Sequence, residues 1–399
     1  MERGARVRLT GHLPGLDGVR GLAILLVMAV HFVGDASAQT LGQRLVVKAA
    51  SYGVLGVDLF FVLSGFLITG LLVDAKDGPN YFRNFYARRT LRIFPLYYLV
   101  LALLFIVLPF AWPLSPALEE ARAHQAWLWT YTANFYIAAR ASWALTYVSH
   151  FWSLAIEEHF YLFWPLVVFS FQRRTLERIC GAVIGAGLLL RVGLALGGMS
   201  ELSISVLTPC RIDTLCVGAL LALLCRRDGW ADEMVRRSGR AALALASVTI
   251  ALSAWCAVAK TGLPVLHQIR GTLYALFFGT LVLISLQPQP SLLARVLRGG
   301  ALRFFGKYSY GLYVYHGLLT WFFIEFHTEA RFDAFFGNHA IAIAAKAACG
   351  VALSVAVAMA SYELFEKPFL SLKRFFEVRE PASPRPAGAG AVPAAGAGD

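Results

Sequence analysis

Histidines, carboxylates and an arginine occur inside long apolar segments, where an ionisable side chain is costly and marks a functional site by default. These residues fall in five different segments: His31, Asp58, Glu157, Glu158, Arg211, Asp213 and His316. A histidine can take a proton from a hydroxyl group, a carboxylate can orient that histidine, and a cation can stabilise an oxyanion. The combination indicates a polar cavity suited to proton transfer.

A second group of residues is suited to anion binding. Arg88, Arg89 and Arg92 lie at the start of the third apolar segment, and Arg20 and Lys307 are expected at a similar depth. Guanidinium groups bind phosphate through paired hydrogen bonds, which makes this group a candidate phosphate site. Arginines beside an apolar segment also anchor it at the inner membrane surface, and this is the alternative explanation.

Arg20 and His31 connect the two groups. They are eleven residues apart, which is about three helical turns, so both lie on one face of a helix and about 16 Å apart along its axis. An isolated histidine at that depth is more often an interfacial residue bonded to a neighbour. Its alignment with Arg20 favours a place in the site instead.

The carboxylates have more than one possible partner. Glu157 and Glu158 are adjacent and differ by about 100° around a helix, so they face different neighbours. We expect one to orient a histidine and the other to pair with an arginine. Arg211 and Asp213 are about 200° apart on their helix, so a structural ion pair is an even alternative for one of them.

The remaining small and polar residues are interpreted by their spacing. Ser309, Tyr313 and His316 share one helical face, which we expect to line the cavity. Ser64 and Gly65 are better explained by close helix packing.

The elements that must position these residues are predicted to be membrane-spanning helices. The chain is 58% hydrophobic and 15% charged, with a mean hydropathy of +0.62. Apolar runs near twenty residues span a bilayer, and in lipid they must be helical. The fold predicted is all-α and polytopic, with about ten spans, at 17–33, 52–73, 92–111, 150–171, 179–197, 207–225, 241–259, 270–287, 304–324 and 340–362.

Charge placement orients these spans. The net charge of +12 could suggest nucleic-acid binding. Most Lys and Arg between the spans, however, fall on one side, which is the positive-inside signature. Both termini are therefore predicted to be cytoplasmic. The predicted regions are a cytoplasmic 1–16, a membrane domain at 17–370 with an extracytoplasmic loop near 112–149, and a disordered cytoplasmic tail at 371–399.

No metal site is predicted. The six cysteines all lie in or beside apolar segments, and no pair has metal-ligand spacing.

Seven strings in this order resemble the membrane-bound acyltransferase family 3, over nearly the whole chain. They are an Arg and a His separated by ten residues (Arg20 and His31), VDLFFVLSGFLIT at 57–69, RRTLRIFP at 88–95, FWSLAIEEHFY at 151–161, RIDTLCVGALLA at 211–222, YSYGLYVYH at 308–316 and FEKPF at 365–369.

The resemblance implies an O-acyltransferase of the bacterial inner membrane. Its donor would be acyl-CoA, usually acetyl-CoA, taken from the cytoplasm as a co-substrate, with no tightly bound cofactor. The acceptor would be a hydroxyl of an envelope glycan, a lipid-linked sugar or a secreted metabolite. The resemblance also implies that Arg20 and His31 are essential and that Arg89 and Arg92 match the family's paired arginines. Some relatives carry a C-terminal esterase-like domain, and we expect this chain to belong with the shorter members.

The mechanism expected from these residues has His31 as the general base on the acceptor hydroxyl. Glu157, Glu158 or Asp58 would orient the imidazole, and Arg211 or His316 would stabilise the oxyanion. The phosphates of CoA would bind the basic group, which comprises Arg20, Arg88, Arg89, Arg92 and Lys307. The acceptor would contact Arg211, Asp213, Ser309 and Tyr313.

Two alternatives stay open at this point. An acyl-histidine intermediate is a second route for the same transfer. A transporter or flippase for a glycan or lipid-linked solute would also have buried charges and a cavity, but it would make no new bond and would not depend on CoA.

Overall fold

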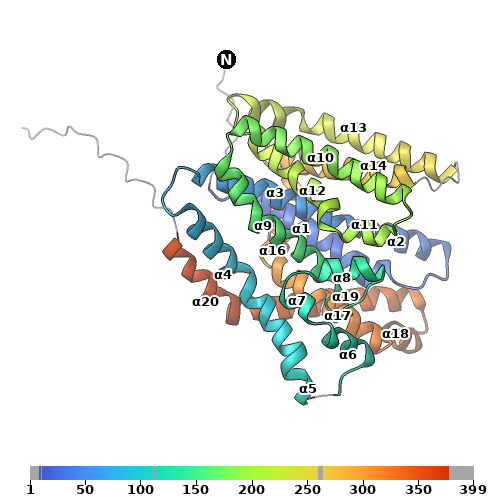
Figure 1. Ribbon diagram of the computed structural model, residues 1–399. Coiled ribbons are helices and arrows are strands. Elements are labelled where there is room, and N and C mark those ends of the chain that lie inside the picture. The colour runs from blue at the N-terminus through green and yellow to red at the C-terminus, as the bar shows by residue number, and fades with distance from the viewer. Residues whose placement is uncertain (1–8, 10, 112, 259–263, 377–399) are drawn as a thin grey trace, which may run out of the picture.

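The computed structural model describes residues 9, 11–111, 113–258 and 264–376, and every regular element among them is a helix. The prediction of an all-α fold is therefore confirmed. Figure 1 shows α1 (Pro14–Ala29) and α3 (Leu55–Ala75) near the middle of the molecule. The helices α10 (Arg173–Leu196), α13 (Trp230–Val258) and α14 (Pro264–Ser285) cover one side, and α4 (Tyr81–Ala102) lies on the other.

Seven helical stretches of the described residues are long and apolar enough to cross a membrane. They are Pro14–Gly34, Leu41–Ala75, Tyr81–Ala111, Arg173–Leu196, Trp230–Trp255, Pro264–Ser285 and His339–Phe376. The other three predicted spans correspond to α9 (Trp152–Ser170), α12 (Thr208–Leu224) and α17 (Ser309–Glu325), which carry polar residues of the site. The total of ten spans and the orientation of the termini stay predictions.

Several boundaries differ from those predicted. Helix α4 begins at Tyr81 rather than near 92, and it continues through Pro95 into its apolar second half. The predicted span 304–324 is divided between α16 (Gly300–Lys307) and α17. The predicted loop at 112–149 holds three short helices, α6 (Pro116–Ala123), α7 (Ala126–Trp129) and α8 (Ala133–Arg140).

The ends of the chain are only partly described. The predicted disorder from 371 is wrong for its first residues, because Leu372–Phe376 form a short 3-10 helix after α20 (Lys367–Ser371). The remaining tail, 377–399, and residues 1–8 and 10 of the predicted N-terminal segment lie outside the described residues.

Glycines bring α3 and α12 into very close contact. A β-carbon added to Gly65 would lie 1.9 Å from the carbonyl oxygen of Leu215, and one added to Gly218 would lie 1.9 Å from that of Val62. Small residues at a helix crossing allow backbones to approach in this way. The packing interpretation of Gly65 is confirmed.

Ion pairs join the same helices. Asp58 of α3 accepts from Arg211 of α12, and Asp213 of α12 lies 2.5 Å from Arg191 of α10. Arg191 also donates to the carbonyl oxygen of Cys210 and to Thr272 of α14. Breaking a buried pair of this kind costs about 3–5 kcal/mol because one charge is left uncompensated.

These pairs correct three predicted roles. Asp58 is engaged by Arg211 rather than by His31, because its carboxylate faces α12. Arg211 and Asp213 were predicted to contact the acceptor, but both are used to hold helices together. The structural alternative therefore applies to both residues.

Replacement of Gly65 or Gly218 by Ala should lower the free energy of unfolding by about 1–3 kcal/mol, since the added methyl group meets backbone atoms that cannot rotate away. Gly185→Ala is the matched control, because a β-carbon there meets nothing within 4 Å. The measurement is the melting temperature of the purified protein in one detergent. Equal melting temperatures for Gly65→Ala and Gly185→Ala would contradict the packing.

Candidate functional site

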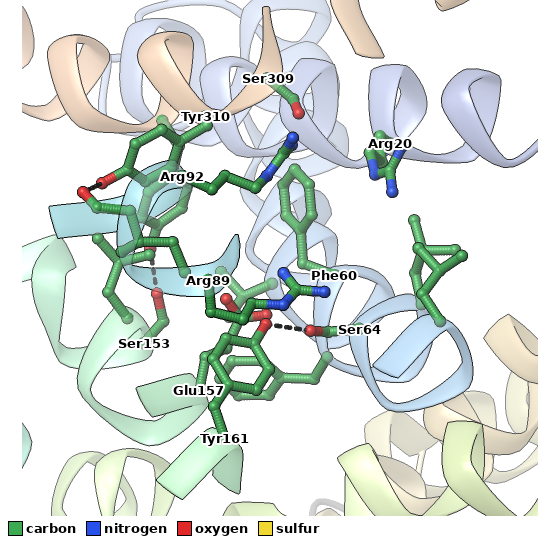
Figure 2. Close-up of a pocket in the computed structure, with 17 residues that line it drawn as sticks. Arg20, Phe60, Ser64, Arg89, Arg92, Ser153, Glu157, Tyr161, Ser309 and Tyr310 are labelled. Atoms are coloured by element: carbon green, nitrogen blue, oxygen red, sulfur yellow. Dashed lines mark hydrogen bonds between the residues drawn. The ribbon is translucent and has the colours of Figure 1, made fainter. Parts of the chain in front are cut away.

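A narrow cavity of about 110 Å³, here called the inner cavity, lies among α1, α3, α4, α9 and α17. Its polar lining residues are Arg20, Ser64, Arg89, Arg92, Ser153, Glu157, Tyr161, Ser309, Tyr310 and Tyr313. Figure 2 shows the guanidinium groups of Arg20, Arg89 and Arg92 gathered around the ring of Phe60. The cavity thus joins predicted members of both the acid–base group and the anion-binding group.

The three arginines differ in how they are held. Arg20 donates to Asp17 one turn earlier on α1, at 2.6 Å. Arg89 lies over the ring of Tyr161, with its guanidinium carbon 5.0 Å from the ring centroid. Within the described part of the chain, neither Arg89 nor Arg92 makes an ion pair with a carboxylate at contact distance. Two guanidinium groups that no carboxylate contacts, beside one cavity, are suited to bind an anion.

The other predicted phosphate ligands lie elsewhere. Arg88 is one residue before Arg89 on α4 and does not line the inner cavity. Lys307 lies in an adjoining small pocket, which shares only Arg92 and Tyr310 with the inner cavity. There the Lys307 ammonium donates to the Tyr308 hydroxyl at 3.0 Å and lies 3.8 Å from Glu363. A lysine that was not predicted, Lys373, is within electrostatic reach of Arg88, Arg89 and Arg92.

Glu157 and Glu158 face different surroundings, as their spacing predicted. Glu157 lines the inner cavity, interacts with the hydroxyls of Ser64 and Tyr161, and is within electrostatic reach of Arg89. Glu158 does not line the cavity, and its Oε1 is buried without a hydrogen-bond partner. Among the described residues, neither glutamate hydrogen-bonds to His31. Ser64 was interpreted as a packing residue, but it lines the cavity and hydrogen-bonds to Tyr161.

His31 follows α1 in a π-helical turn, Val30–Gly34. Such turns widen a helix and are frequent at functional sites. Its Nδ1 lies 2.8 Å from the carbonyl oxygen of Val27. Because a carbonyl oxygen only accepts, the proton of the neutral ring is on Nδ1, and Nε2 keeps its lone pair. A backbone group therefore orients His31, in place of the carboxylate that was predicted.

His31 opens into a second space, here called the outer pocket, of about 360 Å³. The pocket is formed by the π-helical turn Val30–Gly34 and the segment after it, the end of α17, α18 (Thr328–Phe336) and the start of α19 (His339–Ser361). Its polar lining residues are Asp35, Ser37, Gln39, Thr320, His327, Thr328, Glu329, Asp333, His339 and Lys346. Pockets of a few hundred Å³ with convergent polar groups are typical ligand sites.

Carboxylates give the outer pocket its charge. Burial raises the pKa of Asp35, although the nearby His31 and Lys346 act against that shift. Burial alone would also raise the pKa of Glu329, but hydrogen bonds from Lys346 and Ser37 outweigh it and hold the pKa below its usual range. Glu329 is therefore ionised near neutral pH and fixes the Ser37 loop through bonds of 3.0 and 2.8 Å.

Three histidines connect the two spaces. The ring centroids of His31 and His316 are 4.9 Å apart, and those of His316 and His150 are 5.1 Å apart. The predicted equal depth of His31 and His316 is thus confirmed. At the inner end of this row, the Tyr313 hydroxyl donates to the carbonyl oxygen of His150 at 2.8 Å. Ser309 and Tyr313 share one face, as predicted, but they line the inner cavity and not the outer pocket, although they were predicted to contact the acceptor.

Sequence reasoning missed several residues of the site. His150 is the first residue of the predicted span 150–171, which also holds Glu157, and it lies at the depth of the other two histidines. That depth was an available signal. Tyr161 is four residues after Glu157, and Asp17 is three before Arg20, so helical spacing could have found both. Asp35 directly follows the π-helical turn, and Glu329 lies in the first turn of the short helix α18. No spacing rule places either residue beside His31.

Comparisons with known proteins agree with this architecture. A family described as an acyltransferase domain matches residues 13–363. The O-acetyltransferase OatA of Staphylococcus aureus is 29% identical, over 81% of this chain and 53% of the relative. The peptidoglycan O-acetyltransferase OatA of Listeria monocytogenes is 29% identical, over 76% of this chain and 49% of the relative. The chain spans about half the length of these relatives. No solved structure matches it.

The residues that match the family, 13–363, include every residue that lines the inner cavity or the outer pocket. Seven apolar helices and bacterial relatives identify a multi-pass bacterial membrane protein. The chain belongs to the acyltransferase family 3.

Proposed function

We propose that the protein transfers an acetyl group from cytoplasmic acetyl-CoA to a hydroxyl of a cell-envelope glycan, with His31 as the general base. The observation that carries this proposal is the pair of spaces joined by α1. One space holds unpaired arginines, and the other opens onto the free lone pair of His31.

The inner cavity supports binding of the donor. Arg89 and Arg92 can each make paired hydrogen bonds to a phosphate group, and Arg20 adds a third charge. From this basic end the lining continues to Tyr313 and Ser153, beside the histidine row. A narrow passage of this kind suits the thin pantetheine arm of CoA, which would bring the thioester to the level of His31.

The outer pocket supports binding of the acceptor. Carboxylates, hydroxyls, an amide and imidazoles line it, and these groups can hydrogen-bond to the hydroxyls of a sugar. The relatives are named O-acetyltransferase and peptidoglycan O-acetyltransferase. These names support acetyl as the transferred group and a cell-wall glycan as the acceptor class.

In the reaction, Nε2 of His31 removes the proton from the acceptor hydroxyl while the oxygen attacks the thioester carbonyl. Val27 holds the ring by its other nitrogen throughout, so the base keeps one orientation. Collapse of the tetrahedral intermediate breaks the carbon–sulfur bond. The acetyl ester leaves through the outer pocket, and CoA leaves through the inner cavity.

His31→Gln should lower the rate of transfer by about 10²–10⁴-fold, the usual contribution of a general base. The assay follows labelled acetyl from acetyl-CoA to a glycan, with purified protein in lipid. Membrane abundance and melting temperature should match the wild type. Near-normal turnover by His31→Gln would exclude His31 as the base. Movement of unmodified glycan without any CoA requirement would instead indicate a transporter.

Arg89→Gln and Arg92→Gln should raise the KM for acetyl-CoA by roughly ten-fold or more, because a hydrogen bond to a charged group contributes about 1.5–3 kcal/mol. The KM for the glycan should stay within about two-fold. Arg88→Gln is the matched control on the same helix, since Arg88 does not line the inner cavity. An equal effect of all three substitutions would mean that general basic charge, rather than the cavity, binds the donor.

The acceptor should be uncharged near the acetylated hydroxyl. Asp35, Glu329 and Asp333 outnumber Lys346 in the outer pocket, so an acceptor carboxylate would be repelled. We expect a glycan with amidated carboxyl groups to have a lower KM than the same glycan with free carboxylates. A lower KM for the free acid would show that the acceptor binds elsewhere.

A further inference from the structure

We propose that His316 and His150 form, together with His31, a relay that carries the proton of the acceptor hydroxyl to the departing thiolate of CoA. This inference rests on the proposed function, because it assigns the proton path for that reaction. His150 belongs to none of the roles described so far, and His316 was expected only to stabilise an oxyanion.

All three imidazoles are fixed in one tautomer by the backbone. His316 Nδ1 lies 3.1 Å from the carbonyl oxygen of Leu312, and His150 Nε2 lies 3.1 Å from that of Val314. His31 makes the same kind of bond to Val27. Since carbonyl oxygens only accept, each ring donates one N–H and keeps a single lone pair on its other nitrogen.

The two lone pairs inside the protein have no donor. His316 is 0% exposed and His150 is 6% exposed. Among the residues that the structure describes, His316 Nε2 and His150 Nδ1 have no hydrogen-bond partner, and both atoms are buried. A buried acceptor left unsatisfied costs about 1–3 kcal/mol. A purely structural histidine would have no reason to carry this cost, whereas a group that receives a proton must keep its acceptor nitrogen free.

The spacing of the rings fits a proton path. Two imidazoles linked by an N–H···N bond of about 2.9 Å have ring centres roughly 5 Å apart. The centroid distances of 4.9 Å and 5.1 Å along the row match this value. Gly317 permits the close approach of His150 to α17, because a β-carbon at Gly317 would lie 2.2 Å from His150 Nδ1. The free nitrogen of His150 therefore faces the helix that carries His316.

The inner end of the row reaches the cavity proposed for the donor. The ring centroids of His150 and Tyr313 are 5.5 Å apart, and the Tyr313 hydroxyl is hydrogen-bonded to Ser153. Both hydroxyls belong to residues that line the inner cavity, as Figure 2 shows for Ser153. A hydroxyl can receive a proton on its oxygen while it gives its own proton onward. The row thus runs from the outer pocket to the wall of the inner cavity.

A proton is the cation that these lone pairs suit. The described residues hold no group of three or more His, Cys, Asp or Glu side chains arranged for a metal ion. One extra proton shared along the row would satisfy the orphaned nitrogens in turn and leave the three backbone bonds unchanged.

With the relay, every bond and proton of the reaction is accounted for. The acceptor O–H bond breaks as its proton moves to Nε2 of His31, and the carbon–oxygen bond of the ester forms. The carbon–sulfur bond then breaks, and the electron pair stays on sulfur as a thiolate. The proton is accepted and then released by the same nitrogen of each ring, first His316 Nε2 and then His150 Nδ1, because the other nitrogen keeps its N–H on a backbone carbonyl. It then reaches sulfur through the hydroxyl of Tyr313 or Ser153. His31 is again neutral, and the products are the ester and the free thiol.

The test compares two donors on purified protein in lipid vesicles with one glycan acceptor. One donor is acetyl-CoA. The other is the acetyl thioester of a CoA analogue with a more acidic thiol, which leaves without a proton. We expect His150→Gln and His316→Gln to lose about ten-fold or more in kcat with acetyl-CoA and much less with the analogue.

His124→Gln is the matched control, because His124 also bonds through Nδ1 to the carbonyl oxygen four residues earlier but lies outside the row. It should leave both rates unchanged. Equal losses with the two donors, or no loss with either, would overturn the relay. Either variant that keeps the wild-type melting temperature is sufficient for this comparison. A wild-type protein that transfers acetyl from neither donor would instead overturn the proposed function.

Discussion

The proposed reaction depends on one hydrogen bond, between His31 Nδ1 and the carbonyl oxygen of Val27 at 2.8 Å. His31 lies in the π-helical turn Val30–Gly34 that follows α1, and its ring bonds back to the carbonyl oxygen four residues earlier. The bond fixes the tautomer, directs the lone pair of Nε2 away from the helix and needs no carboxylate. The same device, a backbone carbonyl on one nitrogen, recurs at His316 and His150.

A membrane imposes the arrangement around these histidines. Charged side chains inside the membrane must face either an oppositely charged partner or a cavity, and this protein has charged side chains of both kinds. Asp58 and Arg211, like Asp213 and Arg191, neutralise one another between helices and keep α3, α10 and α12 in register. Arg89 and Arg92 instead face a cavity without a carboxylate in contact. This division separates charges that hold the fold together from charges left for an anionic ligand.

Spacing within one helix was readable from the sequence, but contacts between helices were not. The helical fold followed from the lengths of the apolar runs. The shared face of Ser309 and Tyr313 followed from the helical period, and the equal depth of His31 and His316 followed from their positions in the predicted spans. The partner of Asp58 did not follow, because several cations lie at the same depth and only packing selects Arg211. Asp35 was missed because the chain leaves the helix just before it.

In the proposed reaction, donor and acceptor meet at His31 from two separate spaces. The most direct test is an electron cryo-microscopy structure of the protein with a non-hydrolysable acetyl-CoA analogue. We expect phosphate density at Arg89 and Arg92, and an extended pantetheine arm of the analogue that passes Tyr313 so that its acyl end reaches the His31 imidazole. Analogue bound in the outer pocket, or bound in the inner cavity with its acyl group away from His31, would contradict the proposed reaction.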